Sequence, residues 1–521
     1  MADLKDIEMA PKADIEEVGA QDAIEGKELQ SGEKQSHQSG GGTLERYISF
    51  ISAINFGFIL QCSWEAVAVT FQFSLINGGP AAMFYGSLFA GIGTTIVAIS
   101  LAEMASMDPT VGAQYRWSAK LAPRWNEFWG LMQGWMTVFA WICSCTSNPA
   151  ILSNIIVGLA IFNYPDYTPE RWHTTLIMWA FTILPFIGNF WFRRLLNPLE
   201  TVGAICHVAF FIISIITLVV LAQRSTASYV FSTLTHDVSG WSNAAVAWGI
   251  GLLTVTFPLT GFDGVLHMSD EVKRAKTRVP RSMIASVSMN SLMQFAYILC
   301  LLFTIGDVEK VANTPTLLPI IEVYYEATGS KHATNLFVVM LAIIIFIAFF
   351  NVFASVSRLV WAFSRDKGLP FSNFFGYVHP QLKMPLNALA LVGACIMLLA
   401  IINIGSTTAF NAFISLPALA LYISYFFPIL FIFLRRISSN PPTYGPFKLG
   451  ILGIPLNLLA LCYIIFIIVW MPFPTILPVT GNNMNYAGPL VGAVILGALC
   501  DWVISGRKRF QVPVVQQRPD F

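Results

Sequence analysis

Twelve long runs of apolar residues constrain this chain more than any other feature. Each run is long enough to cross a bilayer as an α-helix, which takes about 20 residues, and the apolar residues are continuous rather than alternating as in a barrel strand. The runs cover residues 50–75, 81–104, 127–157, 173–192, 198–222, 244–268, 283–305, 333–363, 387–404, 408–434, 451–473 and 486–505. The sequence therefore predicts an all-α polytopic membrane protein with twelve transmembrane helices.

The composition agrees with this fold class. Apolar residues make up 55% of the 521 residues and charged residues only 11%, about half the charged fraction of a soluble domain. The net charge of +1 gives no reason to expect a nucleic acid partner. The eight cysteines are scattered, mostly within apolar runs, and their spacing suits neither a zinc site nor a redox pair.

Basic residues in the loops predict the orientation of the chain. An even number of spans puts both termini on one side, and twenty lysines and arginines lie in the loops and tail of that side against four opposite. The four are Arg171, Arg224, Lys310 and Lys331. By the positive-inside rule both termini are expected in the cytoplasm, and we expect the plasma membrane as the location.

The two ends of the chain differ from the apolar body. Residues 1–46 are polar, with 11 acids against 5 bases, and are expected to form a disordered cytoplasmic tail. Residues 47–505 form the predicted membrane domain, and residues 506–521 a second cytoplasmic tail. Lys27 and Lys34 are candidate ubiquitin acceptors, which would make a ubiquitin ligase a partner, although both also fit plain solvated charge.

The sixth run contains a predicted helix break. The stretch Thr254–Glu271 carries Pro258, Gly261 and Asp263 within six residues. Proline removes a helical hydrogen bond and glycine permits the dihedral angles that follow. Inside a membrane such a break survives only where protein or a water-filled cavity receives the freed backbone groups, so the carboxylate beside it marks a candidate binding site.

The first run carries a matching irregularity. Its middle holds Gln61, Cys62, Ser63, Trp64 and Glu65, and an ionisable residue at this depth is costly unless it faces protein or water. Runs one and six are five apart, as expected for two inverted repeats of five helices. Paired irregular segments in corresponding positions indicate the binding site of a transporter.

The chemistry of two such breaks suits a small polar substrate. The free N–H groups at the start of a half-helix favour a carboxylate, whereas free carbonyls and Asp263 or Glu65 favour an ammonium group. Trp64, Phe257 and Phe262 are placed to stack on a cationic head. The alternative is that the glycines of both runs only permit close helix packing.

Several motifs together resemble one transporter family. The motifs are Asn77-Gly78-Gly79-Pro80, Leu101–Trp117 (LAEMASMDPTVGAQYRW), Thr260–Gly264 (TGFDG), His267–Glu271 (HMSDE) and Val279-Pro280-Arg281. In this order they resemble the fungal amino acid, choline and GABA permeases of the amino acid–polyamine–organocation superfamily, over roughly residues 45–505. The resemblance implies a five-plus-five inverted repeat with broken helices 1 and 6, two further helices, and movement of a small amine or amino acid, commonly with protons.

The resemblance also implies a substrate site between the two breaks. The substrate would meet Leu60–Trp64 at one end and Thr256–Asp263 at the other. The candidate residues are Gln61, Cys62, Ser63, Trp64, Glu65, Thr256, Phe257, Thr260, Gly261, Phe262 and Asp263. Where the superfamily often has glutamate and a glycine-rich first break, this chain has Asp263 and Gln61-Cys62-Ser63, which leaves choline, GABA and other amines open.

Two residues are candidates for proton coupling. His207 lies halfway along the fifth run, where its ordinary pKa near 6.5 allows protonation at physiological pH; the alternative is a neutral histidine bonded between helices. Asp263 is the stronger candidate because a desolvated acid takes up a proton more readily. Ser355 on the eighth run is the corresponding sign of sodium coupling, and we prefer the proton. No metal or organic cofactor is expected.

A gate is predicted at the cytoplasmic end of the second run. Glu103 and Asp108 lie there, near Arg116 and the basic loop 273–281, and ion pairs between them would close the inner mouth. The same charges equally fit simple anchoring in the head-group region.

Other functional classes fit less well. We find no filter-like loop of a channel, no nucleophile elbow or HExxH motif of an enzyme, and no nucleotide-binding P-loop. The sequence therefore predicts a secondary active transporter that works by alternating access. A nutrient sensor on the same fold and an uncoupled facilitator remain as alternatives.

Overall fold

The computed structural model describes residues 46, 48–191, 196–405, 409–439, 441–481 and 483–511, with side chains omitted at 196–197, 309 and 409–411. Almost all of the expected tail 1–46, with Lys27 and Lys34, and most of the second tail lie outside the described residues. So do three basic residues of the orientation argument, Arg193, Arg194 and Arg518.

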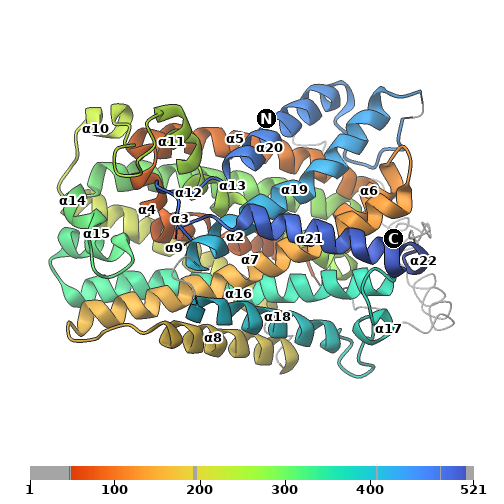
Figure 1. Cartoon of the computed structure of the whole chain (residues 1–521), viewed down its shortest axis with the longest axis horizontal. Coiled ribbons are helices and arrows are strands. Elements are labelled where there is room, and N and C mark those ends of the chain that lie inside the picture. The colour runs from red at the N-terminus through yellow and green to blue at the C-terminus, as the bar shows by residue number, and fades with distance from the viewer. Residues whose placement is uncertain are drawn as a thin grey trace, which may run out of the picture.

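Twelve segments of the described chain are long and apolar enough to cross a membrane, and we number them as spans 1 to 12 (Figure 1). Span 1 consists of α2 (Phe50–Gln61) and α3 (Ser63–Thr70). Span 6 consists of α11 (Ala244–Gly251), α12 (Leu253–Thr256), η2 (Phe257–Leu259) and η3 (Phe262–Glu271). The other ten are α5 (Gly79–Met107), α7 (Asn126–Asn163), α8 (Arg171–Trp191), α9 (Leu196–Leu221), α13 (Ala275–Thr304), α16 (Lys331–Arg365), α18 (Leu386–Gly405), α19 (Ala409–Ile437), α20 (Gly453–Trp470) and α21 (Ala487–Asp501). The predicted all-α, twelve-span fold is confirmed.

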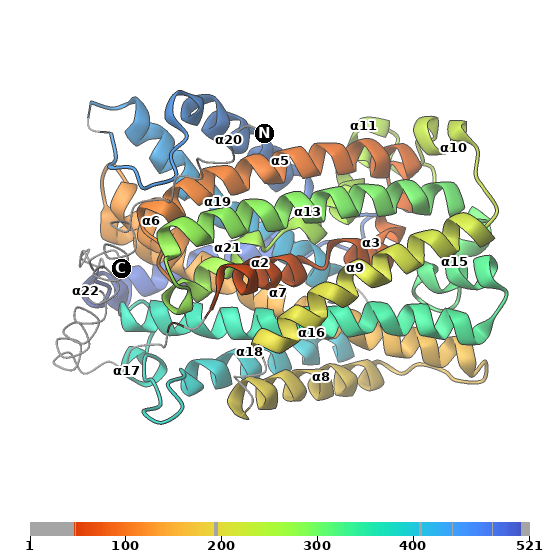
Figure 2. The same cartoon turned by 180° about the vertical axis from the view of Figure 1, so that it is seen from behind.

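Short helices cover the two ends of the bundle (Figures 1 and 2). One end carries α10 (Ala227–Ser232), α14 (Val308–Ala312) and α15 (Pro319–Thr328), and the other carries α6 (Ala113–Leu121), α17 (Ser372–Phe375) and α22 (Arg507–Arg509). The remaining short elements are α4 (Gln72–Ile76), η4 (Gly450–Leu452) and the π-helical turn η5 (Trp502–Gly506).

Several spans extend past the apolar runs that predicted them. At 1.5 Å per residue, the 38 residues of α7 measure roughly 57 Å, nearly twice the thickness of a hydrocarbon core. Span 7 begins at Ala275, ahead of the expected residue 283, and includes Pro280. The extra residues are charged, so this helix continues beyond the membrane where charge is solvated.

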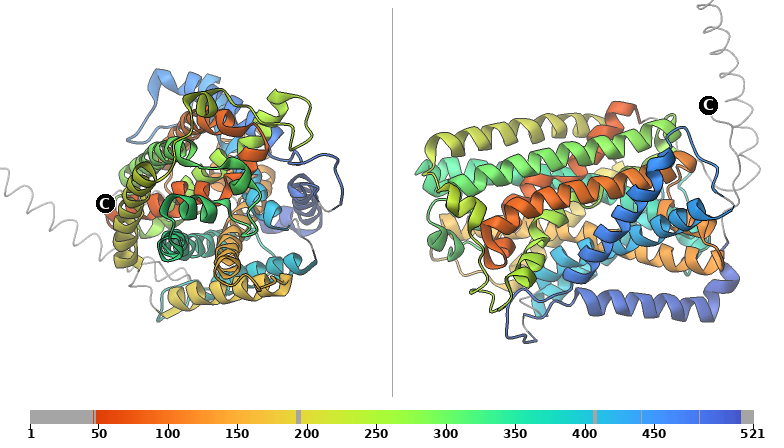
Figure 3. Two further views of the ribbon diagram at one scale, coloured as in Figure 1. Left: turned by 90° about the vertical axis from the view of Figure 1, so that its left-hand side faces the viewer. Right: turned by 90° about the horizontal axis from the view of Figure 1, so that it is seen from above.

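The packing of the spans shows the repeat. Span 2 packs along span 7, span 3 along span 8, and span 4 along span 9. Each of these three helices therefore lies against its counterpart five positions later, as expected for two related five-helix halves. Spans 11 and 12 are added outside: α20 packs on α5 and α19, and α21 on α7 and α19. The view along the bundle in Figure 3 shows the helices running together with α21 at the edge.

Both described ends of the chain lie at one end of the bundle. Ile48 forms a parallel bridge to Val272, donating to the carbonyl of Glu271 (3.0 Å) and accepting from the amide of Lys273 (3.3 Å). The amide of Gln511 donates to the carbonyl of Asp366. We call this the terminus-bearing end. Loops that follow spans 6 and 8 thus meet the first and last described residues.

Candidate functional site

Span 1 is interrupted at Cys62. The residue has φ +34° and ψ +54°, in the left-handed region that side-chain-bearing residues seldom adopt. Its amide bonds back to Ile59, which ends α2, and α3 begins at Ser63 without a side-chain cap. The first N–H groups of α3 therefore have no carbonyl partner within the helix.

Span 6 is interrupted over a longer stretch. Pro258 tightens the chain into the 3₁₀ turn η2, Thr260 is extended, and Gly261 turns at φ +81° into η3. A Cβ at position 261 would lie 3.2 Å from Leu60 and 3.5 Å from Trp141. Glycine is needed there for its dihedral angles and for the close approach of span 1. The predicted breaks of helices 1 and 6 are both present.

Side-chain amides donate hydrogen bonds to backbone carbonyls near the two breaks. Gln61 Nε2 donates to the carbonyl of Leu259 (2.9 Å), so it joins the two breaks directly. Gln294 Nε2 donates to the carbonyl of Val255 (2.9 Å). Asn290 Nδ2 donates to the carbonyl of Phe58 (3.0 Å) and Ser63 Oγ donates to Asn290 Oδ1 (2.7 Å). These bonds replace those that an unbroken helix would make.

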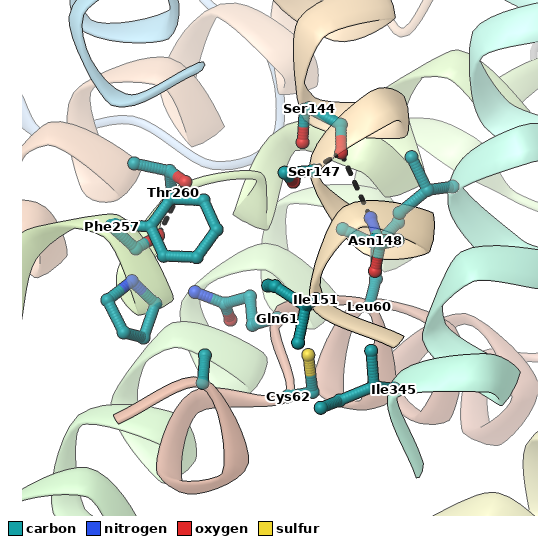
Figure 4. A pocket seen from close by; sticks show the side chains of 13 residues that line it. Leu60, Gln61, Cys62, Ser144, Ser147, Asn148, Ile151, Phe257, Thr260 and Ile345 are labelled. Carbon is teal, nitrogen blue, oxygen red and sulfur yellow. Dashed lines mark hydrogen bonds between the residues drawn. The ribbon is translucent and has the colours of Figure 1, made fainter. Parts of the chain in front are cut away.

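A small cavity lies where the breaks meet span 3 (Figure 4). Its lining residues are Leu60, Gln61, Cys62, Ala66, Ser144, Ser147, Asn148, Ile151, Phe257, Pro258, Thr260, Ile345 and Val352. The volume is about 30 Å³, which holds one or two water molecules and no amino acid. In this conformation the site is contracted, and a substrate requires the walls to separate.

Span 3 supplies the polar wall of the cavity. Ser147 Oγ and Asn148 Nδ2 both donate to the carbonyl of Ser144, at 2.8 and 3.0 Å, and Figure 4 shows these side chains on one face of the helix. Pro149 has no N–H for the carbonyl of Cys145. Of the described residues that line the cavity, all are uncharged.

The sequence identified part of this lining. Of the eleven residues predicted to bind substrate, Gln61, Cys62, Phe257 and Thr260 line the cavity. The others are buried beside it: Ser63 bonds to Asn290, Trp64 packs on Tyr297, and Phe262 packs on Tyr425. Thr256 and Gly261 are also fully or almost fully buried within span 6 and outside the lining. The polar face of span 3 was missed, although Asn148-Pro149 within an apolar run is a signal that could have found it.

Asp263 does not face the cavity, contrary to the prediction that it meets the substrate's ammonium group. It is completely buried, and its Oδ1 accepts from the hydroxyl of Tyr425 (2.5 Å). Its Oδ2 accepts from Gln114 Nε2 (2.5 Å) and Trp141 Nε1 (3.3 Å). Three donors from α19, α6 and α7 hold the carboxylate on the far side of the break. Sequence offers no signal for partners 122 to 162 positions away.

Glu65 and His207 form a buried pair. Glu65 lies in the first turn of α3, three residues after the break, and its Oε1 is 2.6 Å from His207 Nδ1 on span 5. Both side chains are fully inaccessible. Glu65 Oε2 and His207 Nε2 have no hydrogen-bond partner among the described residues. The pair has room in its hydrogen bonding for one more proton.

The predicted gate has different partners from those expected. Glu103 pairs with Arg436 at the end of span 10 and accepts from the amide of Leu449 (2.7 Å). Asp108 pairs with Lys120. Neither acid meets Arg116 in an ion pair within the described residues, so the expected Glu103–Arg116 partnership is wrong. Arg116 lies in α6, and residues 108–112 separate that helix from the end of α5.

An unpredicted ion pair closes the same end of the bundle. Arg358 Nε on span 8 donates to Glu271 Oε1 at the end of span 6 (3.0 Å), and both side chains are fully buried. Arg358 had been counted within an apolar run. The pair ties the last turn of η3 to span 8.

Comparisons with known proteins identify relatives of this chain. Residues 48–496 match the family model of amino acid permeases. A protein named "Putative amino acid/polyamine transporter" from Macrophomina phaseolina is 31% identical over 437 residues, which cover 83% of this chain and 96% of that protein. The choline transporter of Saccharomyces cerevisiae is 28% identical and covers 90% of this chain with 83% of its own length. A homolog of amino-acid permease BAT1 from Oryza sativa subsp. japonica is also 28% identical, over 97% of this chain and 98% of its own.

Proposed function

Because this chain belongs to the amino acid permease family, and is therefore a membrane transporter rather than an enzyme, we propose that it imports a zwitterionic amino acid with protons. The cargo binds between the breaks of spans 1 and 6, and the two sides of the membrane gain access to it in turn. The family is shared with proteins named for amino acids, choline and polyamines, so the choice among them depends on the cavity.

The uncharged lining of the cavity favours a zwitterionic substrate over a cation. A choline or polyamine cation would leave its charge in a buried space where no described lining residue is acidic, and a buried charge without a partner is costly. A zwitterion brings both charges itself. Its carboxylate fits the free N–H groups at the start of α3, where the helix dipole favours an anion.

The ammonium group fits the broken part of span 6. Gln61 Nε2 donates a hydrogen bond to the carbonyl of Leu259. This carbonyl can therefore accept a hydrogen bond from another N–H group. A substrate ammonium replaces this amide when Gln61 moves away, and the movement also enlarges the cavity. The hydroxyls and amide of Ser144, Ser147 and Asn148 then face the rest of the substrate.

Proton coupling is assigned to Glu65 and His207. Their 2.6 Å contact and full burial make a proton-sharing pair, and Glu65 belongs to the same first turn of α3 that receives the carboxylate. A proton on the pair reduces the negative charge next to that carboxylate. Substrate and proton therefore favour each other's binding through one turn of helix.

The orientation follows from the charge distribution. The loops and tail at the terminus-bearing end carry most of the lysines and arginines, which supports a cytoplasmic location for both termini. Import through the plasma membrane is the corresponding direction.

Uptake by the purified full chain in liposomes tests the proposal. Labelled GABA, neutral α-amino acids, choline and spermidine are compared with and without an imposed proton gradient, with protein-free liposomes as the control. We expect a zwitterion to accumulate only with the gradient. Saturable choline or spermidine uptake without zwitterion uptake would overturn the substrate class, and equal uptake without the gradient would overturn the coupling.

A matched pair of variants tests the proton site. Glu65→Gln should abolish gradient-driven accumulation while exchange of labelled for unlabelled substrate across equal pH continues, because the glutamine keeps the hydrogen bond but carries no titratable charge. Glu127→Gln, on the exposed first turn of α7, is the control and should change neither. Gradient-driven accumulation by Glu65→Gln at the wild-type rate would refute the assignment.

A further inference from the structure

Each broken span places an acid just after its break, and each acid faces a histidine. Glu65 follows Cys62 by three residues and contacts His207 at 2.6 Å. Asp263 follows Gly261 by two residues, and its Oδ2 lies 3.7 Å from Nε2 of His267. All four side chains are fully buried. The first pair is used in the proposed coupling, whereas the second has no role in the function argued so far.

The two pairs lie in opposite halves of the protein. From its break, α3 runs away from the terminus-bearing end, because Ile48 precedes span 1 there. From its break, η3 runs toward that end, where the carbonyl of Glu271 receives the amide of Ile48. The substrate cavity lies between the breaks. One acid–histidine pair therefore flanks the cavity on each side.

The hydrogen bond of His267 shows which ring nitrogen is open to a further proton. Nδ1 lies 2.8 Å from the carbonyl of Val111, an acceptor only, so Nδ1 must carry a hydrogen. In the neutral imidazole Nε2 is then an acceptor with no hydrogen. It has no hydrogen-bond partner among the described residues and lies 3.7 Å from Asp263 Oδ2. Adding a proton at Nε2 changes this contact into a charge-assisted hydrogen bond.

The groups around this pair leave His267 as the side chain that can take up a proton. Around Asp263, α6 contributes the neutral amide of Gln114, α7 the indole of Trp141, and α19 the hydroxyl of Tyr425. On α16, Ser355 donates to the carbonyl of Gly264, and Arg358 is bonded to Glu271. Spans 1, 2 and 7 also pack on η3, and no described residue of theirs makes an ion pair with Asp263 or His267.

We propose that Asp263 and His267 form a second proton-binding site, on the other side of the substrate cavity from Glu65 and His207. Proton uptake at His267 Nε2 joins two side chains of η3. Asp263 is held by Gln114, Trp141 and Tyr425, and His267 is held by the carbonyl of Val111. The site therefore stabilises the docked position of the inner half of span 6 when its side of the membrane is acidic. The proposal adds a regulatory proton to the proposed transport cycle, but proton binding itself does not depend on which substrate is carried.

Tryptophan fluorescence measures proton binding without transport. The ring of Trp141 stands edge-on to His267, with centroids 5.2 Å apart, and a protonated imidazole quenches a nearby indole. The purified full chain is titrated from about pH 9 to about pH 4, around the ordinary histidine pKa, beside Trp141→Phe. The difference between the two curves should contain one titration. A flat difference would overturn the proposal, whether or not any variant of His267 folds.

Variants then assign the titration. His267→Asn keeps a side-chain N–H in reach of the carbonyl of Val111 and removes Nε2; His207→Asn is the matched control at the other pair. We expect the Trp141 titration to vanish in His267→Asn and to persist in His207→Asn. Persistence in His267→Asn, or loss in both, would overturn the assignment to His267.

Transport separates this proposal from the proposed function. In His267→Asn, substrate exchange at equal pH should continue within about twofold of wild type but lose its dependence on the pH of the terminus-bearing side. In His207→Asn that dependence should remain while gradient-driven accumulation is lost. An unchanged pH dependence in His267→Asn would contradict the second site alone, whereas accumulation by His207→Asn would contradict the first.

Discussion

At the scale of single residues, two backbone positions decide whether the breaks can form. Gly261 turns at φ +81° and approaches Leu60, and Cys62 holds φ +34° in the left-handed region. Position 261 has glycine, which adopts a positive φ readily, whereas position 62 has a residue with a side chain, which does not. The two therefore respond in opposite ways to substitution.

Gly261→Ala should destabilise the protein by more than its backbone angle alone accounts for. The left-handed conformation costs a residue with a side chain about 1–2 kcal/mol, and here the new Cβ also meets Leu60 at 3.2 Å. Gly329→Ala is the matched control, because Gly329 has φ +60° and nothing within 4 Å of its Cβ position. Thermal unfolding in detergent and uptake should fall further in Gly261→Ala. Equal losses would show that the contact with span 1 is unimportant.

Cys62 should be the thiol through which small reagents inactivate transport. It lines the cavity, whereas Cys462 and Cys500 are exposed on the outer helices. Cys62→Gly relieves the left-handed backbone, so we expect it to fold, transport and resist a small methanethiosulfonate reagent. Substrate should protect the wild type. Continued inactivation of Cys62→Gly would show that another cysteine is the reactive thiol.

At the scale of elements, the sequence predicted the discontinuities better than the contacts. Proline and glycine act on their own backbone, so Pro258 and Gly261 located the break in span 6. The partners of Asp263 come from three other elements. The sequence around Asp263 does not indicate which distant residues will pack against it. For the same reason the partners expected for Glu103 were Arg116 and the basic loop 273–281, and not Arg436.

The ion pair between η3 and α16 should behave as a unit. Glu271→Gln leaves Arg358 charged and buried, and breaking a buried pair on one side costs about 3–5 kcal/mol. The double variant Glu271→Gln/Arg358→Met removes the charge and should recover much of that loss. Unfolding temperatures of the two single variants and the double give the coupling. Additive losses would mean that the pair contributes no mutual stabilisation.

At the scale of the whole molecule, the twelve spans and their five-helix repeat could be predicted from apolar length and paired irregularities alone. The contraction of the cavity could not, because it depends on the fit of Gln61, Phe257 and Ile151 from three spans. Two buried ion pairs between helices distant in sequence lie at the terminus-bearing end.

The Glu103–Arg436 pair joins span 2 to span 10 there, with exposed side-chain fractions of 0% and 6%. Arg436→Gln leaves the acid uncompensated and should lower both stability and uptake, while Glu103→Gln/Arg436→Gln should restore much of the stability. Lys120→Gln removes a partner of the more exposed Asp108 and should cost at most about 1 kcal/mol. Uptake rates and unfolding temperatures of the four proteins check this. Equal effects of Arg436→Gln and Lys120→Gln would contradict it.

The bridge between Ile48 and Val272 connects the residue just before span 1 to the end of span 6, one of the two broken spans that line the cavity. Its two hydrogen bonds attach Ile48, just before span 1, to Glu271 at the end of η3 and to Lys273 beyond it. Any movement of η3 must therefore carry Ile48 with it or break these two hydrogen bonds. We therefore expect a bulky group attached just ahead of Ile48 to slow transport, from outside the membrane and without touching the substrate.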